Sequence, residues 1–261
     1  MALRTTAIVN LKGGVAKSTT AINMAAILAK EHGRKILIID ADSQCNTSEF
    51  FGADPKLGNL AEVLRGSGFY ENPGDYAASR IQPTNFPGID ILSGEDALMD
   101  LDLSKVEQGT VNSNILRYLV NEVAAKYDHA FIDCPPAFNA ASAAALIAAD
   151  DVIIPIKLDA FSLRGMSNLM RQIKNMRRIN PRLILAGVLP TMWYRDDKIT
   201  EAEKQLQQAG LRVFHHIRRS DKVDRMTFQQ EPLLVSSPNS AAGVDYRRFV
   251  NEFLGGEHNG L

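Results

Sequence analysis

The segment with the clearest chemical potential is Lys-Gly-Gly-Val-Ala-Lys-Ser at residues 12–18, between an apolar run at 7–9 and a long helical pattern. A strand that leads through a glycine-rich turn into a helix directs several backbone N–H groups, and the positive end of the helix dipole, into one concavity. Such a concavity binds phosphate. Lys17 can reach the terminal phosphates of a nucleotide, and the Ser18 hydroxyl can ligate the accompanying Mg²⁺.

This loop departs from the standard phosphate-loop pattern Gly-x4-Gly-Lys-Ser/Thr. The two glycine positions hold Leu11 and Ala16, and an additional lysine, Lys12, stands at the head of the loop. A chance glycine-containing turn is the alternative, but the Lys-Ser pair stands at the correct place in a strand–turn–helix order. We therefore expect the whole loop to contact the nucleotide: Lys12, Gly13, Gly14, Val15, Ala16, Lys17, Ser18 and Thr19.

Two further apolar runs end in acidic residues. Residues 36–39 lead into Asp40 and Asp42, and residues 129–132 lead into Asp133. Short β-branched runs are typical of central strands in a parallel sheet, whose carboxyl edge binds ligands. An acid at that edge can support the Mg²⁺ shell or orient an attacking water, although it can also be a turn residue or a helix cap.

Together these segments resemble the ParA/MinD family of ATPases, and within it the ParA partition proteins. The similarity extends from about residue 7 to about residue 253, with three main motifs and three weaker ones: 12–19, 40–44 and 131–136, then 153–155, 163–165 and 217–220. Four residues depart from the family pattern. Ala16 and Cys45 stand where glycine is usual, and Ser43 and Arg218 stand where proline is usual.

The resemblance implies an ATPase that uses Mg²⁺ and forms a homodimer with ATP. It implies that Lys12 of one subunit reaches the phosphates of the other, while Lys17 contacts the β- and γ-phosphates and Asp42 orients the attacking water. Ser18 would ligate Mg²⁺ and Asp133 would support its water shell. Met192 and Arg218 are further expected nucleotide contacts, with Arg218 near the adenine.

The overall net charge of −1 does not indicate a nucleic-acid partner, so the local distribution of charge matters more. The resemblance implies nonspecific DNA binding through basic residues near the C-terminal end: Arg218, Arg219, Lys222, Arg225, Arg247 and Arg248. A second basic cluster at 171–182 is first interpreted as a solvated helix face, with DNA contact as the alternative. Contacts to phosphate need charge and no base readout.

Length and composition are typical of a soluble cytoplasmic enzyme. The 261 residues are 45% hydrophobic and 23% charged, and no apolar run approaches the roughly 20 residues that span a bilayer. The first strand begins within a few residues of the start, which leaves no room for a signal peptide. The two cysteines, Cys45 and Cys134, make no disulfide framework and are expected to be incidental thiols.

The alternation of patterns predicts one α/β domain over residues 1–261, a doubly wound and mostly parallel sheet flanked by helices. We expect a long surface loop at 66–88 and helix-ending glycines at 33 and 210. Strands are expected near 4–10, 35–40, 89–93, 129–134, 151–156, 183–189 and 212–217. Helices are expected near 17–31, 58–65, 112–127, 139–149, 161–179, 197–209 and 240–254.

The function expected from these features is an ATP-dependent DNA partition ATPase, associated with the nucleoid and stimulated by a ParB-like centromere-binding protein. Because only residues 1–6 precede the first strand, we expect the short form without an N-terminal DNA-binding extension. The tail at 253–261 lacks the basic amphipathic pattern of a MinD-like membrane helix. A MinD-like positioning ATPase, a small-molecule synthetase of the same superfamily and a non-hydrolysing scaffold remain alternatives, and the cargo is not specified.

Overall fold

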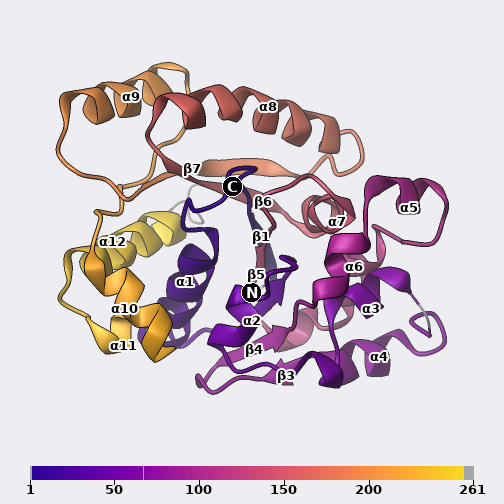
Figure 1. The fold of residues 1–261 in the computed structure, drawn as a ribbon. Coiled ribbons are helices and arrows are strands. Elements are labelled where there is room, and N and C mark those ends of the chain that lie inside the picture. Colours follow the sequence, from indigo (N-terminus) through magenta and orange to yellow (C-terminus); the bar gives the residue numbers. More distant parts are fainter. Residues whose placement is uncertain (1, 67, 256–261) are drawn as a thin grey trace.

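Residues 2–66 and 68–255 are described in the computed structural model, apart from the side chains of 160–164. Their strands form one seven-stranded sheet in the order β3-β4-β2-β5-β1-β6-β7 (Figure 1). Neighbouring strands run parallel except for β3 and β4. The predicted α/β class, with a doubly wound and mostly parallel sheet, is confirmed. The strands are β1 Arg4–Ile8, β2 Ile36–Asp40, β3 Gln82–Pro83, β4 Ile89–Leu92, β5 His129–Asp133, β6 Asp151–Lys157 and β7 Ile184–Thr191.

Helices cover both faces of this sheet. The α-helices are α1 Lys17–His32, α2 Asn46–Phe50, α3 Leu60–Arg65, α4 Pro73–Arg80, α5 Leu103–Glu107, α6 Ile115–Glu122, α7 Ala140–Ala148, α8 Ala160–Met176, α9 Asp197–Gln208, α10 Asp221–Gln229, α11 Leu233–Ser236 and α12 Ala241–Gly255. Short 3₁₀ helices occur at Pro55–Leu57, Asp96–Asp100 and Ala124–Lys126. The first helix ends as predicted, because Gly33 is left-handed (φ 63°) and its N–H donates to the Leu28 carbonyl.

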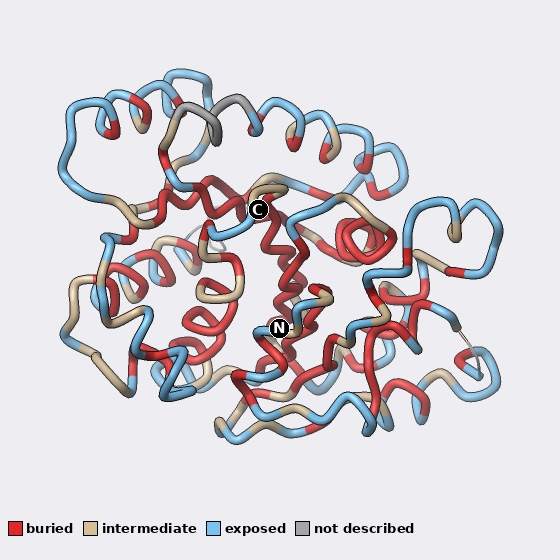
Figure 2. The backbone as a smooth tube through the Cα atoms, viewed as in Figure 1, coloured by how far each residue is buried: buried red, intermediate tan, exposed pale blue. Residues whose placement is uncertain are grey.

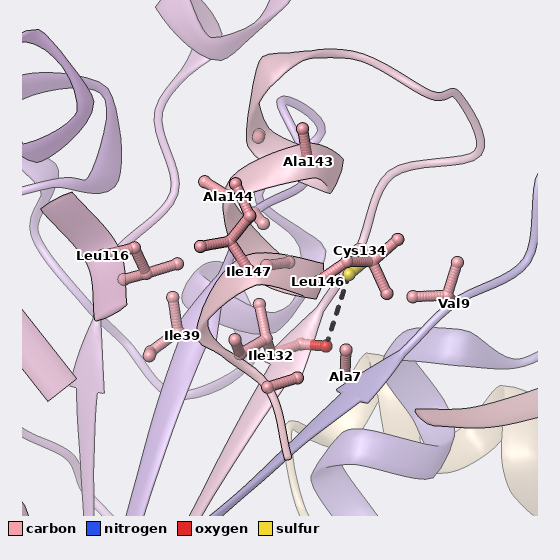
Figure 3. Packing of buried hydrophobic residues seen from close by; sticks show 14 of the residues in the cluster. Ala7, Val9, Ile39, Leu116, Ile132, Cys134, Ala143, Ala144, Leu146 and Ile147 are labelled. Atoms are coloured by element: carbon pink, nitrogen blue, oxygen red, sulfur yellow. Dashed lines mark hydrogen bonds between the residues drawn. The ribbon is translucent and has the colours of Figure 1, made fainter. Parts of the chain in front are cut away.

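The two faces of the sheet contribute to two separate hydrophobic clusters. One cluster joins the sheet to α3, α6, α7, α8 and α9, and the other joins it to α1, α11 and α12. Figure 2 shows the sheet and the inner sides of these helices as the buried part of the molecule. Cys134 belongs to the first cluster, where it lies among Ala7, Val9 and Leu146, and its thiol lies 3.7 Å from the Ile132 carbonyl (Figure 3). This cysteine is therefore a core residue.

The secondary structure differs from the expectations in several places, and the short helices α2, α5 and α11 were not predicted. Residues 212–217 form no strand but only isolated bridges to β7 and its extension, because Pro190 has no N–H to continue a ladder there. The region 66–88 contains α4 and β3 rather than one long loop. The helix α10 was missed because, of its nine residues, only Met226 is buried, so its sequence lacks a clear apolar stripe.

Within the described residues, no helix is long and apolar enough to cross a membrane. The weak family motif at 163–165 lies mostly among the residues whose side chains are not described.

Candidate functional site

The phosphate loop lies between β1 and α1, at the carboxyl edge of the sheet (Figure 1). Gly13 and Gly14 are exposed, and α1 begins at Lys17. Ala16 caps this helix in the left-handed conformation, with φ of 66°. Its carbonyl accepts hydrogen bonds from the Thr20 backbone N–H at 2.9 Å and the Thr20 hydroxyl at 2.7 Å. Alanine thus adopts the backbone shape that glycine prefers, at a cost of about 1 kcal/mol or more.

Lys17 points into the interior of the loop. Its side chain is buried, and its Nζ lies 3.3 Å from the Lys12 carbonyl oxygen. Burial lowers the pKa of this lysine, while the nearby carboxylates of Asp133 and Asp42 act in the opposite direction. A buried ammonium enclosed by carbonyl and carboxylate oxygens is well placed to bind a phosphate oxygen.

Lys12 points elsewhere. Its Nζ forms an ion pair with Asp159 at 2.7 Å, just beyond β6. Its backbone N–H donates to the Asn10 side chain, which in turn donates to the Pro155 carbonyl at 2.7 Å. The two lysines of the loop therefore have separate surroundings, with Lys17 inside the loop and Lys12 at its rim.

Asp133 ends β5 beside the loop, with no exposed surface. The Thr47 hydroxyl donates to its Oδ2 at 2.7 Å, whereas its buried Oδ1 has no hydrogen-bond partner. Burial raises the pKa of Asp133 to about 6, against the effect of the Ser18 and Thr47 hydroxyls. An unsatisfied buried carboxylate oxygen near a serine hydroxyl fits a hydrated Mg²⁺ held by Ser18, so these residues suit that ion.

Asp40 and Asp42 have different surroundings although they are two residues apart. Asp40 is fully buried, and its Oδ2 accepts hydrogen bonds from the backbone N–H and the hydroxyl of Ser48. Its Oδ1 accepts the N–H of Asp42. Burial and the charge of Asp133 raise the pKa of Asp40 to about 7. Asp42 instead lines the cleft and accepts the Gln44 N–H at 3.1 Å. Asp40 thus holds the segment that presents Asp42.

Behind this pair, Gly94 packs against the backbone of the Asp40–Asp42 segment. A Cβ at this position would lie 3.0 Å from the Asp42 carbonyl oxygen and 3.1 Å from the Asp40 carboxyl carbon. The Gly94 N–H also donates to the Ser48 hydroxyl. Residues 94 and 48 therefore complete the support of the acidic segment, and neither was predicted from the sequence.

A cleft of about 1250 Å³ joins the loop to the far wall, which carries the expected contacts Met192 and Arg218. Sequence reasoning missed other residues of this wall. Thr191 lies at the end of β7 and donates to the Val15 carbonyl at 3.2 Å, and Tyr194 and Phe228 line the opening. The position of residues 191–194 directly after a parallel strand could have identified them. No comparable pattern marks Phe228.

Next to this wall, the single tryptophan of the chain forms an aromatic stack. The Trp193 ring lies parallel to that of His216, with centroids 3.8 Å apart. The indole N–H donates to Glu203 of α9 at 3.1 Å, and His216 lies 3.5 Å from the same carboxylate. This stack connects the segment after β7 to α9 and to residues 215–217.

The six basic residues expected to bind DNA differ in whether their charge is already paired with a carboxylate of the protein. Arg218 forms two bonds of 2.8 Å to the Asp245 carboxylate, through Nε and Nη2. Four of the six form an ion pair with a carboxylate. The other two, Arg219 just before α10 and Arg225 on α10, are exposed and have no ion pair among the described residues. The other ion pairs are Lys222–Asp221 at 3.3 Å, Arg247–Glu31 at 2.7 Å and Arg248–Glu252 at 3.6 Å.

Comparison with known proteins agrees with this geometry. Residues 3–185 match the family model described as AAA domain. The chromosome partitioning protein ParA of Caulobacter vibrioides is 35% identical over 267 residues, covering 98% of this chain and 95% of that protein. The chain belongs to the ParA/MinD family of ATPases. The resemblance predicted from the three motifs is therefore confirmed.

Solved structures share the fold of this ParA-family chain. The apo McdA structure from Cyanothece superposes with a TM-score of 0.82 at 22% identity, covering 97% of this chain and 100% of that one. Cobyrinic acid a,c-diamide synthase from Mycobacterium smegmatis, with bound ADP and magnesium, gives a TM-score of 0.82 at 27% identity. It covers 99% of this chain and 97% of its own. This fold is thus shared by proteins that are named for different roles.

Proposed function

We propose that this protein is an ATP-dependent DNA partition ATPase. It would dimerise on ATP, bind DNA without sequence preference and be stimulated by a ParB-like centromere-binding protein to segregate a plasmid or a chromosome. The observation that carries this proposal is the separation of the two lysines, one buried inside the loop and one at its rim. The near full-length similarity to a chromosome partitioning protein supports the cellular role.

Nucleotide binding would use the loop and its buried lysine. Backbone N–H groups of the loop from Gly13 to Thr19 would bind phosphate oxygens, and Lys17 would bind the β- and γ-phosphates. Ser18 and Asp133 would hold Mg²⁺, which when bound neutralises charge on the phosphate oxygens. Met192 and Arg218 would border the base. In this arrangement the unsatisfied Asp133 oxygen gains a partner.

Hydrolysis would depend on Asp42, which borders the cleft and is held by Asp40. Its carboxylate would orient the attacking water and accept its proton. Lys12 would exchange Asp159 for the phosphates of the neighbouring subunit, where a cation offsets charge that develops during hydrolysis. The active site would then be complete only in the dimer, in a cytoplasmic protein associated with the nucleoid.

The decisive experiment compares Lys12→Ala with the parent protein. Because Lys12 lies outside its own phosphate pocket, the variant should retain nucleotide binding in calorimetry. It should lose ATP-driven dimerisation in light scattering and DNA-stimulated hydrolysis. Lys30→Ala, an exposed lysine at the end of α1, is the matched control. A Lys12→Ala protein that still dimerises with ATP would show that this lysine does not act across the subunit interface.

A second candidate function is a small-molecule synthetase that uses the same loop. The 27% identity to cobyrinic acid a,c-diamide synthase over nearly the whole chain favours its consideration. The two functions differ in what accelerates ATP consumption. Stimulation by duplex DNA supports partition, whereas ATP consumption that requires a carboxylate acceptor and an amide donor supports the synthetase.

A further inference from the structure

The longest stretch of the chain without an acidic residue runs from residue 160 to residue 195. It carries seven basic residues, although the whole chain has 29 basic and 30 acidic ones. The stretch contains α8, the following turn and β7. In the region near α10, where DNA contacts were first expected, basic and acidic residues are instead mixed. The positive charge of the stretch 160–195 must be balanced by solvent ions or by an anionic partner.

The described cations of α8 lie on its outer side. Met166, Leu169, Ile173 and Met176 form the buried stripe that packs on the sheet. Figure 2 shows exposed positions along the opposite side of the helix. Arg171, Lys174 and Arg178, at spacings of three and four residues, share that exposed side on α8 and the turn after it. Arg171 and Arg178 are separated by about 10 Å along the axis at 1.5 Å per residue.

These side chains are available for an external partner. In the described part of the chain, no carboxylate lies within 4 Å of Arg171, Lys174, Arg178 or Arg182 as an ion-pair partner. Arg171 donates instead to the Asn168 side chain at 2.8 Å. In contrast, four of the six cations expected to bind DNA are paired with carboxylates. Binding DNA through those four would require breaking ion pairs first.

We propose that the outer face of α8 and its following turn, with Arg171, Lys174, Arg178 and Arg182, is the surface that binds the phosphate backbone of duplex DNA. This inference rests on the proposed function, in which the ATP-bound protein binds DNA. It identifies a different face of the molecule from the one that the family resemblance suggested.

The chemistry of the face favours DNA over an acidic protein. Its neutral members Ser167, Asn168 and Asn175 are exposed polar residues that can donate hydrogen bonds to phosphate oxygens. Protein interfaces instead have an apolar or aromatic centre. The described outer positions of α8 carry no apolar side chain, and in the following turn Ile179 is exposed beside Arg178. At one end, Arg182 and Arg117 line a hollow of about 460 Å³, whose lining also includes Asp150.

The test compares two triple variants in the presence of ATP and Mg²⁺. One is Arg171→Gln/Lys174→Gln/Arg178→Gln, and the matched control is Lys222→Gln/Arg225→Gln/Arg248→Gln. Binding to two labelled duplexes of unrelated sequence is measured by fluorescence anisotropy between about 50 and 200 mM salt. The α8 variant should lower the log–log salt slope by about 2 to 3, equally for both sequences, since each lost phosphate contact removes about 0.9. The control should retain the parent slope.

Thermal unfolding and basal ATP hydrolysis of the α8 variant should match the parent. If the triple variant does not fold, Lys174→Gln alone should lower the slope by about 0.9. An unchanged slope in the α8 variant, with a loss in the control, would overturn this inference and leave the proposed function intact. A parent protein that binds no duplex DNA would overturn both. Equal displacement of DNA by polyglutamate or by anionic vesicles would assign the face to a general polyanion and would also overturn it.

Discussion

The cleft has two sides that are built in different ways: a phosphate side, formed by the phosphate loop and the ends of β2 and β5, and a base side, formed by residues 191–194 and α10. On the phosphate side, Asp40, Thr47 and Asp133 have no exposed surface and are linked to the ends of β2 and β5. On the base side, Tyr194 is 52% exposed, Phe228 is 90% exposed, and α10 buries a single residue. The polar groups proposed to surround the triphosphate are thus buried in the protein interior, whereas the wall proposed to contact the base is largely exposed. Changes on the first side should therefore affect chemistry and folding together, and changes on the second side mainly affinity.

Both sides nevertheless share one property, which is backbone strain. Among the described residues, the non-glycine residues with positive φ are Ala16, Cys45, Met192 and Gln230. Three of them line the cleft, and Cys45 lies between two residues that do. Such conformations cost about 1–3 kcal/mol each and tend to occur at functional sites. Their concentration here supports the position of the site independently of the motifs.

The largest expected effect tests the phosphate side. Lys17→Ala should reduce ATP affinity at least about 100-fold, because it removes a buried charge that bonds phosphate oxygens. Isothermal calorimetry with ATP and Mg²⁺ measures the change, with Lys30→Ala as control. Unchanged ATP affinity would contradict the assignment of residues 12–18 as a phosphate-binding loop, and the two sides of the cleft would then not differ in function as proposed.

The next effect separates the two aspartates of one segment. Asp42→Ala should slow hydrolysis by about 10²-fold while ATP affinity is retained, because it removes a positioned base and leaves the loop intact. A persistent DNA-bound dimer should accumulate. Asp40→Ala should instead lower the melting temperature, since three hydrogen bonds to the segment are lost. Normal turnover in Asp42→Ala would move the catalytic role to another residue.

A smaller effect concerns pH. The folded-state pKa values of Asp40, about 7, and Asp133, about 6, lie above the ordinary value of 3.8. Between about pH 4 and 7 the folded protein binds more protons than the unfolded chain, so these two groups lower the stability of the unliganded protein as pH rises. Since one pKa unit corresponds to about 1.4 kcal/mol, the loss should be on the order of several kcal/mol. Denaturant titrations across this range should give a weaker pH dependence for Asp133→Asn, and an identical dependence would contradict the assignment.

The smallest effect concerns the strained loop. Ala16→Gly should raise the free energy of unfolding by about 0.5–1 kcal/mol, because glycine adopts positive φ without steric cost. Ala29→Gly, within α1, should lower it by about 1 kcal/mol. Chemical denaturation of the two variants measures both changes. A destabilised Ala16→Gly protein would mean that the methyl group makes contacts that outweigh the strain.

The sequence predicted the phosphate side much better than the base side. Residues 12–19, Asp42 and Asp133 follow apolar strands, so hydrophobic periodicity and the rule that ligands bind at strand ends located them together. Their chemical roles remain predictions. The support by Ser48 and Gly94 was missed because these residues approach the acidic segment only through folding of distant parts of the chain.

The base side was predicted poorly for two physical reasons. The helix α10 has too few buried positions to produce a periodic pattern, and Phe228 has no sequence context that marks a ligand contact. The ion pairs of Arg218 and Arg247 join residues 27 and 216 positions apart, respectively, so a local charge count overstated the availability of these cations.

The stack of Trp193 on His216 gives the protein an internal optical reporter. Indole emission responds to the orientation and protonation of a neighbouring imidazole, and the chain has one tryptophan. That tryptophan directly follows Met192, which borders the cleft, and its N–H is bonded to α9. We therefore expect nucleotide binding at the base side to change the emission of this one tryptophan in unlabelled protein.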